Sequence, residues 1–295
     1  MEVALSHWSA SWPVLAGYAV VAAAHLAGLR RVSAAARRPD LVREALLFHA
    51  GLLITVLALV SPVGYWSHVY IWVRALQELL VIMIGPGLMV LGAPWLPLRS
   101  AVRPPNGQAH RGTSRADDGA LAGRVPILVA QPVLAVIGFN VVFLGWHLPV
   151  LFDLARSSSA VALVEHATYV AAGLLFWLAL IGLRPFSPSA SPLRRFAYLI
   201  ATAAAATVLG MVLVFGSGVL YPAYAGAAHH VMTVLDDEQL AGATLWMGVL
   251  PPTIIAAVAL LLQWLGNEES SELAADLDRL LAPRKHAWPS RPVIR

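Results

Sequence analysis

The chain has 295 residues, of which 59% are hydrophobic and only 12% charged. Soluble domains carry about 25% charged residues, so a chain this poor in charge cannot cover a surface exposed to water. The net charge of +4 is too scattered to indicate nucleic-acid binding, and the lack of cysteine excludes disulfides, thiolate metal sites and iron–sulfur clusters.

Seven apolar runs are long enough to cross a bilayer as α-helices, since about 20 residues span its hydrocarbon core. In chain order they occupy residues 12–29, 44–60, 68–91, 126–146, 159–182, 197–219 and 239–265. We therefore predict an all-α, polytopic membrane protein, with a seven-helix transmembrane domain over residues 1–265 and a tail over residues 266–295.

The loops between these runs differ in their basic charge. Four segments that alternate along the chain hold eighteen of the twenty Lys and Arg residues: five in 30–43, five in 99–124, three in 184–195 and five after residue 266. By the positive-inside rule the side with the basic loops is cytoplasmic. The sequence therefore predicts an N-terminus outside and a C-terminal tail in the cytoplasm.

The third run contains two charged residues, Arg74 and Glu78, within WVRALQELL. Ionised side chains are costly inside a bilayer and indicate function by default. Residues four apart share one face of a helix, so we expect these two to form a buried ion pair. The pair either fixes the third helix against its neighbours or forms one wall of a polar cavity open to the outside.

Further polar side chains fall in the outer half of the predicted bundle. His147 and Asp153 lie near the outer end of the fourth run, and Glu165 and His166 lie about two turns inside the fifth. Glu165 should face the bundle and hydrogen-bond to Tyr169. The alternative interpretations are an interfacial residue for His147 and a hydrogen-bonded core histidine for His166.

The outer loop 220–238 contains the sequence HHVM, which brings His229, His230 and Met232 close together. Two imidazoles and a thioether suit copper better than zinc or magnesium, so these residues are candidate metal ligands. The acidic run at 236–238 is explained equally well as a solvated start of the seventh helix.

Six short motifs occur in order along the second to seventh runs. They are ALVSP (58–62), GPGLMVLGAP (85–94), WHLPVLFD (146–153), EHATYVAAGLLFW (165–177), LYPAY (220–224) and DEQLAG (237–242) with Trp246. Together they resemble the CtaG-like family of cytochrome c oxidase assembly factors, seven-helix proteins associated with caa-type oxidases.

The resemblance implies a non-enzymatic membrane protein of the bacterial cell that assists assembly of a heme–copper oxidase, with oxidase subunits as partners. Copper delivery at the outer face is the implied role, with copper as the implied metal. The implied metal-site residues are His147, Glu165 and His166. The implied supporting residues are Gln77, Asp153, Asp237 and Trp246.

One departure concerns the third run, where the family carries the pattern H-M-x-Q-H. Here the sequence is RALQE, which keeps Gln77 but replaces the two histidines by Arg74 and Glu78. Arginine stays protonated and cannot ligate copper. The chain is therefore identified as a divergent member of the family that lacks the histidine pair.

Other function classes fit less well. A transporter of ions or small molecules could use Arg74, Glu78 and Glu165, but the sequence lacks the internal repeat of many transporters. A retinal protein needs a lysine inside a helix, and the chain's single lysine is Lys285 in the tail. A heme protein would need histidines at matched depth on neighbouring helices. No nucleophile elbow, phosphate loop or HExxH motif indicates an enzyme.

The predicted topology can be tested because the chain has no cysteine of its own. In intact cells, Ala227→Cys should react with a membrane-impermeant thiol reagent, because residue 227 lies in an outer loop. Ser114→Cys should react only after the cells are opened. The reverse pattern of labelling would contradict the orientation and the position of the predicted site.

Overall fold

The computed structural model describes residues 7–8, 11–32, 40–102, 131–182, 190–227 and 231–281. Within these ranges every regular element is helical, which confirms the predicted all-α class. Six helices are long and apolar enough to cross a membrane, or seven if one bent pair counts as a single span. The orientation of the two ends relative to the membrane stays a prediction.

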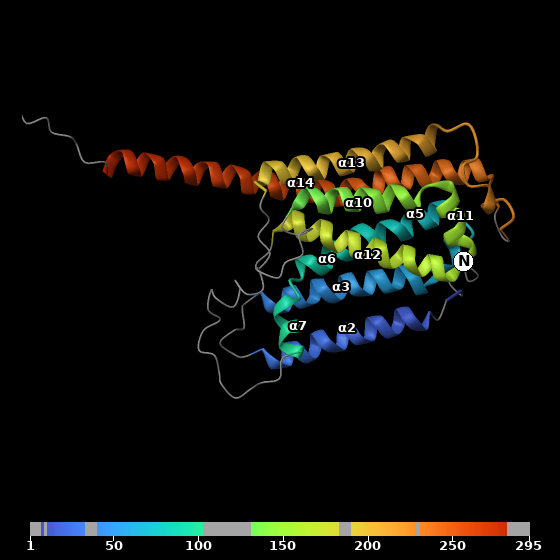
Figure 1. The fold of residues 1–295 in the computed structure, drawn as a ribbon, viewed down its shortest axis with the longest axis horizontal. Helices are drawn as coiled ribbons and strands as arrows, with labels where there is room; N and C mark the ends of the chain where they lie inside the picture. The colour runs from blue at the N-terminus through green and yellow to red at the C-terminus, as the bar shows by residue number, and fades with distance from the viewer. Residues whose placement is uncertain are drawn as a thin grey trace, which may run out of the picture.

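The elements follow one another along the chain as a bundle of long helices joined by short ones (Figure 1). They are α2 (Trp12–Arg31), α3 (Leu41–Val60), α4 (Pro62–Trp66), α5 (Ile71–Leu79), the π-helix η2 (Leu80–Ile84), α6 (Gly85–Leu91), α7 (Trp95–Val102), α10 (Pro132–Trp146), α11 (Pro149–Ser157), α12 (Ser159–Ile181), α13 (Pro192–Phe215), the 3-10 helix η3 (Pro222–Tyr224) and α14 (Val234–Leu281).

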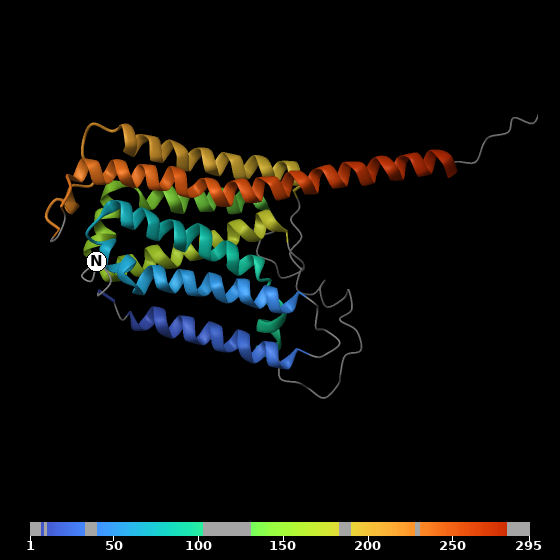
Figure 2. The ribbon, with the colours of Figure 1, turned by 180° about the vertical axis from the view of Figure 1, so that it is seen from behind.

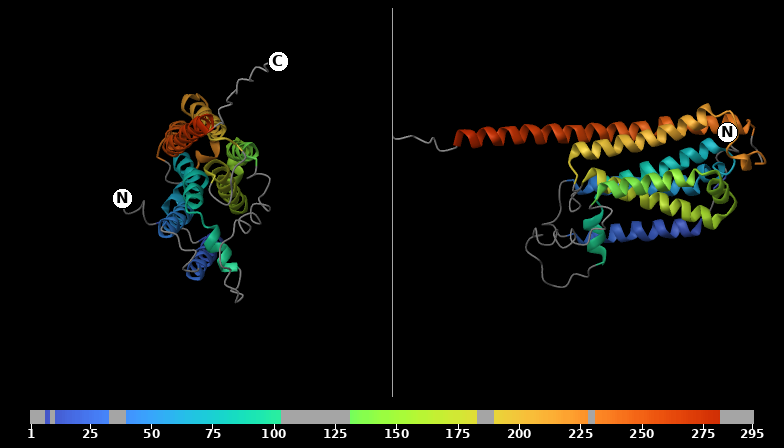
Figure 3. Two further views of the ribbon diagram at one scale, coloured as in Figure 1. Left: turned by 90° about the vertical axis from the view of Figure 1, so that its left-hand side faces the viewer. Right: turned by 45° about the horizontal axis from the view of Figure 1, so that its top comes forward.

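The bundle is elongated in cross-section. Viewed along the helices, α2 and α3 lie at one end and α13 and α14 at the other, with α5, α6, α10 and α12 between them (Figure 3). The α5–η2–α6 span lies between α3 and α14, as the view from behind shows (Figure 2). About 78% of that span is buried, against 11% of the window in α2, so this span forms the centre of the bundle.

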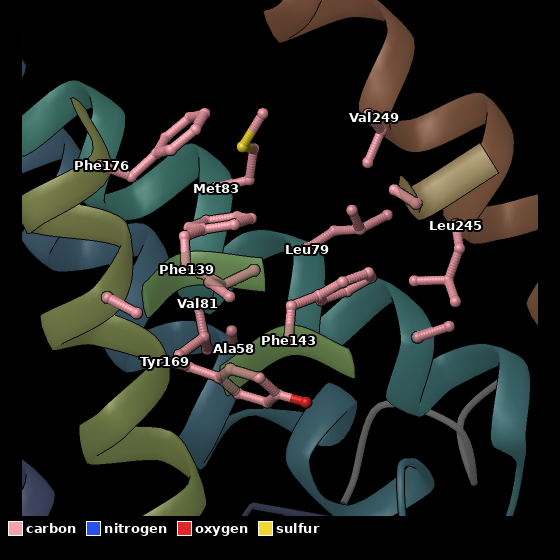
Figure 4. Close-up of a cluster of buried hydrophobic side chains, with 14 of the residues drawn as sticks. Ala58, Leu79, Val81, Met83, Phe139, Phe143, Tyr169, Phe176, Leu245 and Val249 are labelled. Carbon is pink, nitrogen blue, oxygen red and sulfur yellow. The ribbon is translucent and has the colours of Figure 1, made fainter. Parts of the chain in front are cut away.

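The hydrophobic core surrounds this central span. Figure 4 shows Phe139 and Phe143 of α10 directed toward Val81 and Leu79 of the span, with Tyr169 and Phe176 approaching from α12. These side chains belong to one continuous cluster of buried residues that also includes α13 and α14. Because the core is built around the span that carries Arg74 and Glu78, those two charges lie inside it.

The central span changes from α- to π-helical at Leu80 and returns to α-helical at Gly85. Pro86 has no N–H to donate, and proline inside a helix commonly disturbs the hydrogen-bond ladder before it. In the same turn the Met83 carbonyl accepts a hydrogen bond of 2.9 Å from Trp177 Nε1 of α12. The π-helical turn therefore fixes α12 against the central span.

Several predicted spans differ from the observed helices at their ends, among them the sixth, predicted at 197–219 and observed as α13 at Pro192–Phe215. The fourth, predicted at 126–146, ends at Trp146, but the chain bends by 71° and continues as α11, because Leu148 before Pro149 is extended. The seventh, predicted at 239–265, begins at Val234 and runs unbroken into the predicted tail as far as Leu281. Residues 268–281 are rich in Glu, Leu and Ala, which favour helix.

The contact between α12 and the π-helical turn depends on Gly173. A Cβ at this position would collide with the Ile82 carbonyl oxygen, so only glycine allows the two backbones to lie so close. Another glycine, Gly182, ends α12 in the left-handed conformation with φ 67°, which other residues rarely adopt.

We expect Gly173→Ala to lower the free energy of unfolding by about 1–3 kcal/mol, since added volume in a packed core forces backbone shifts. The matched control is Gly138→Ala in α10, where an added Cβ would meet no atom within 4 Å. That control should be neutral or stabilising by up to about 1 kcal/mol, the difference in helix propensity. Thermal unfolding of both variants in detergent measures this, and equal midpoints would contradict the proposed close contact.

Candidate functional site

The side chain of Arg74 is the centre of a buried cluster of charged and polar groups. Its Nε donates to Glu78 Oε1 at 3.1 Å, one turn further along α5. Both side chains are almost fully buried, with 5% and 1% of their surface exposed. The structure thus places the two residues in contact across one helical turn, as their spacing predicts.

The second carboxylate of the cluster comes from α12. Glu165 Oε1 lies 2.6 Å from Arg74 Nη2, so this carboxylate binds the guanidinium rather than the Tyr169 hydroxyl that the sequence suggested. Tyr169 lies instead beside Glu78, without a well-aligned hydrogen-bond partner for its hydroxyl among the described residues. One guanidinium therefore holds carboxylates from two helices.

The remaining Arg74 donor is shared between two oxygens near the end of the bundle. Nη1 donates to the Phe152 carbonyl of α11 at 2.9 Å and to the Tyr224 hydroxyl at 3.4 Å. The Phe152 ring lies 3.7 Å from the guanidinium carbon, a cation–π contact that adds stabilisation away from water. Arginine suits this position because its planar fork can bind several acceptors at once.

The Tyr224 hydroxyl joins the cluster to the start of the central span. It donates to the Ser67 carbonyl at 3.0 Å while it accepts from Arg74. Burial raises the pKa of Tyr224, so the hydroxyl keeps the proton that this donation needs. The connection between α13 and α14 is therefore hydrogen-bonded to the cluster through a neutral tyrosine.

His147 lies where the chain bends between α10 and α11. With only 6% of its surface exposed it is buried within the bundle. Its Nδ1 lies 2.8 Å from the Phe143 carbonyl, and its Nε2 lies 3.2 Å from Glu78 Oε2. The histidine thus contacts the oxygen of Glu78 that Arg74 does not bind.

These contacts fix where protons must be. A carbonyl only accepts hydrogen bonds, so Nδ1 of His147 carries a proton. In a neutral ring Nε2 is then an acceptor, and it would repel the lone pairs of an ionised Glu78. One further proton on His147 or Glu78 would remove this repulsion at 3.2 Å, and with Arg74 and Glu165 charged the whole cluster would then have no net charge. A neutral cluster is the state that burial in a low-dielectric interior favours.

The acidic run at the start of α14 is mostly buried rather than solvated. Asp236 is exposed, but Asp237 and Glu238 have 0% and 1% of their surface accessible. Asp237 accepts from the backbone nitrogens of Ile71 and Trp72 at 2.8 and 3.0 Å, at the start of α5. The Tyr70 side chain that precedes α5 makes no capping bond, so a carboxylate from another helix caps it.

Glu238 has a similar role toward the chain that follows α13. Its carboxylate accepts from the backbone nitrogens of Leu220 and Tyr221, the shortest of these bonds being 2.6 Å. The Tyr221 hydroxyl in turn donates to the His147 carbonyl at 2.9 Å. Burial raises the pKa of this hydroxyl too, which keeps it a donor. The segment before α14 is thus hydrogen-bonded at both tyrosines to the cluster around Arg74.

The other predicted site residues lie at different distances from the cluster. Gln77 donates to the Ala58 carbonyl at 2.8 Å and fixes the central span to α3. His166 is only partly buried, and no hydrogen bond joins it to the cluster in the described part of the chain. Asp153 is partly buried with one oxygen unpartnered, and Trp246 packs against Gly210 between α13 and α14. Met232 is described, whereas His229 and His230 lie outside the described residues.

The arrangement around Arg74 does not fit a copper ion. Among the described residues no three His, Asp or Glu side chains are placed to hold a metal. A permanent positive charge occupies the centre, and both nitrogens of His147 already have partners. A cavity of about 10 Å³ beside Glu78 and His147 has room for about one water. The histidine-to-arginine departure thus corresponds to a compact, self-neutralised cluster.

Sequence reasoning missed two members of this cluster, Phe152 and Tyr224, and the buried capping role of Glu238. Each lies within a motif that was noticed, WHLPVLFD, LYPAY or DEQLAG, so the signal was present. What the motifs do not show is that their members converge on Arg74.

Comparison with known proteins gives one match. The sequence model of the family described as cytochrome c oxidase caa3 assembly factor matches residues 23–267, most of the chain. The match covers all of the helices that contribute to the cluster. No curated protein and no solved structure matches the chain at a significant level.

The proton count of the cluster predicts unequal effects for its two carboxylates. Glu78→Gln should cost roughly 1 kcal/mol, because the amide can accept from Arg74 and donate to Nε2 of His147. Glu165→Gln should cost about 3–5 kcal/mol, because it leaves the buried cluster with an uncompensated positive charge. Chemical or thermal unfolding in detergent would distinguish the two variants. A Glu78→Gln protein as unstable as the Glu165→Gln protein would contradict the shared proton.

Proposed function

Because the chain belongs to the cytochrome c oxidase caa3 assembly factor family, we propose that it assists assembly of a heme–copper cytochrome c oxidase in the bacterial cell membrane. We propose that its specific role in assembly is to deliver copper at the outer face, with oxidase subunits as its partners. The family is one of assembly factors, which indicates a non-enzymatic protein.

The main support for the assembly role is that the residues around Arg74 all lie within the range matched by the family model. Four motifs within the matched range supply the cluster: WHLPVLFD gives His147 and Phe152, EHATY gives Glu165, LYPAY gives Tyr224, and DEQLAG gives the two capping carboxylates. Although the helix that faces them carries Arg74 and Glu78 in place of histidines, the motifs still meet around it. The frame of the family is therefore kept while its centre differs.

In this proposal copper is cargo and is held outside the cluster. The candidate ligands are His229, His230 and Met232, whose imidazole and thioether groups suit copper. The segment before them is hydrogen-bonded to the cluster through Tyr221 and Tyr224. A charge cluster at the former position of the histidines can thus serve to fix the start of the segment that would carry the metal.

A transporter that uses Arg74, Glu78 and Glu165 is less well supported. The three side chains are paired with one another and buried. The cavity that reaches Glu78 has a volume of only about 10 Å³, too small for a substrate larger than water.

The proposal is tested in a deletion strain grown with limiting copper. Oxidase activity and heme spectra should fall while oxidase transcripts stay unchanged, and the wild-type gene should restore them. Normal oxidase activity in the deletion strain would contradict the assembly role.

The copper role is tested separately by complementation with the triple variant His229→Ala, His230→Ala, Met232→Leu. We expect a loss of oxidase activity at limiting copper that added copper reverses, because only delivery is impaired. The matched control replaces one histidine and one methionine elsewhere, His286→Ala in the tail and the exposed Met247→Leu. Full activity of the triple variant at limiting copper would reject copper delivery by this segment and leave the assembly role intact.

A further inference from the structure

A long apolar groove lies between the central span, α12 and α14, away from the charge cluster. Its volume is about 320 Å³, and its lining is apolar except for one amide, Gln263. Its walls include Met83 and Leu91 of the central span, Leu180 of α12, and Ile255, Ala259 and Gln263 of α14. Leu91 and Ile255 on its rim are 43% and 72% exposed, so the groove opens toward the surroundings of the bundle.

One end of the groove lies beside a buried arginine. Arg195 of α13 has only 7% of its surface exposed, and its Nη1 and Nη2 donate to the Leu180 carbonyl at 2.6 Å and to Gln263 Oε1 at 3.2 Å. Both acceptors belong to residues that line the groove. Arg195 is in the first turn of α13, which begins at Pro192, so it lies where a spanning helix meets the membrane surface.

Among the residues that the structure describes, none neutralises the charge of Arg195. Its two partners are neutral, its Nε has no hydrogen-bond partner, and in the described part of the chain no carboxylate pairs with it. A buried charge of this kind is costly unless an anion compensates it. The neighbouring Arg194 is exposed, so it has no such need.

We propose that the groove binds one acyl chain of an anionic phospholipid, whose phosphate lies on Arg195 and Gln263. An apolar groove open to the bilayer accommodates the chain, and a basic pocket between spanning helices recognises an anionic head group. The uncompensated charge of Arg195, whose Nη1 and Nη2 reach Leu180 and Gln263 on the wall of the groove, attracts the phosphate. The site is independent of the copper proposal, because it shares no residue with the Arg74 cluster or the outer loop.

The test measures lipid binding to the purified full-length protein by native mass spectrometry. The probes are phosphatidylglycerol and phosphatidylcholine with identical oleoyl chains. We expect phosphatidylglycerol to bind about fivefold tighter, the factor that corresponds to about 1 kcal/mol for one basic side chain. Equal affinity of the two lipids for the wild type would overturn the proposal.

Charge variants locate the head group. Arg195→Gln should abolish the preference for phosphatidylglycerol, whereas Arg194→Gln, one residue away and exposed, should keep it. Gln263→Glu should also abolish the preference, because the new carboxylate pairs with Arg195 and repels phosphate. Since Arg195 keeps a partner in this variant, it tests the site even if Arg195→Gln fails to fold. A loss of preference in Arg194→Gln equal to that in Arg195→Gln would indicate general surface charge and reject the site.

A volume variant locates the acyl chain. Ala259→Trp places an indole in the groove and should weaken binding of both lipids. Its control is Ala204→Trp on α13, an exposed alanine that does not line the groove. If Ala259→Trp binds both lipids as Ala204→Trp does, the chain does not lie in this groove.

Discussion

The fold is organised by the need to keep one arginine in an apolar interior. Arg74 lies on the most buried span and binds groups from α5, α11, α12 and the 3-10 helix before α14. Each contact brings a different part of the chain to the same end of the bundle. His147 contacts the free oxygen of Glu78, and Asp237 of α14 caps α5, the helix that carries Arg74. The position of several loops thus follows from the demand that one charge be compensated.

The same demand explains how Arg74 and Glu78 can occupy the positions where the family resemblance implied a histidine pair. Arg74 provides a positive charge, and Glu78 a hydrogen-bonding carboxylate, for the residues of the other helices that meet here. In place of imidazoles that could ligate metal, this chain has a guanidinium paired with the carboxylates of Glu78 and Glu165. Copper handling, if moved to the outer segment, then requires from the bundle only a fixed support.

Sequence patterns predicted contacts between residues of the same helix and missed contacts between different helices. The spacing of Arg74 and Glu78 was enough to predict their contact, because both positions follow one helical period. The Arg74–Glu165 contact was not predictable in the same way, because depth in the membrane does not reveal which neighbour a side chain faces. Asp237 and Glu238 precede a helix and so resemble its own solvated start. No local pattern shows that they bind backbone of other segments. The proline at residue 86 was visible, but the π-helical turn before it depends on packing against α12.

The separation of the Arg74 partners along the chain bears on how the protein enters the membrane. Helices are made in chain order, and Phe152, Glu165 and Tyr224 follow Arg74 by 78, 91 and 150 residues. When the central span first meets the bilayer these groups do not yet exist. Glu78, one turn away on the same helix, is a counter-charge that arrives together with the arginine. Glu78 can therefore neutralise Arg74 while the central span is being inserted. The partners from later helices bind Arg74 only after those helices have been inserted.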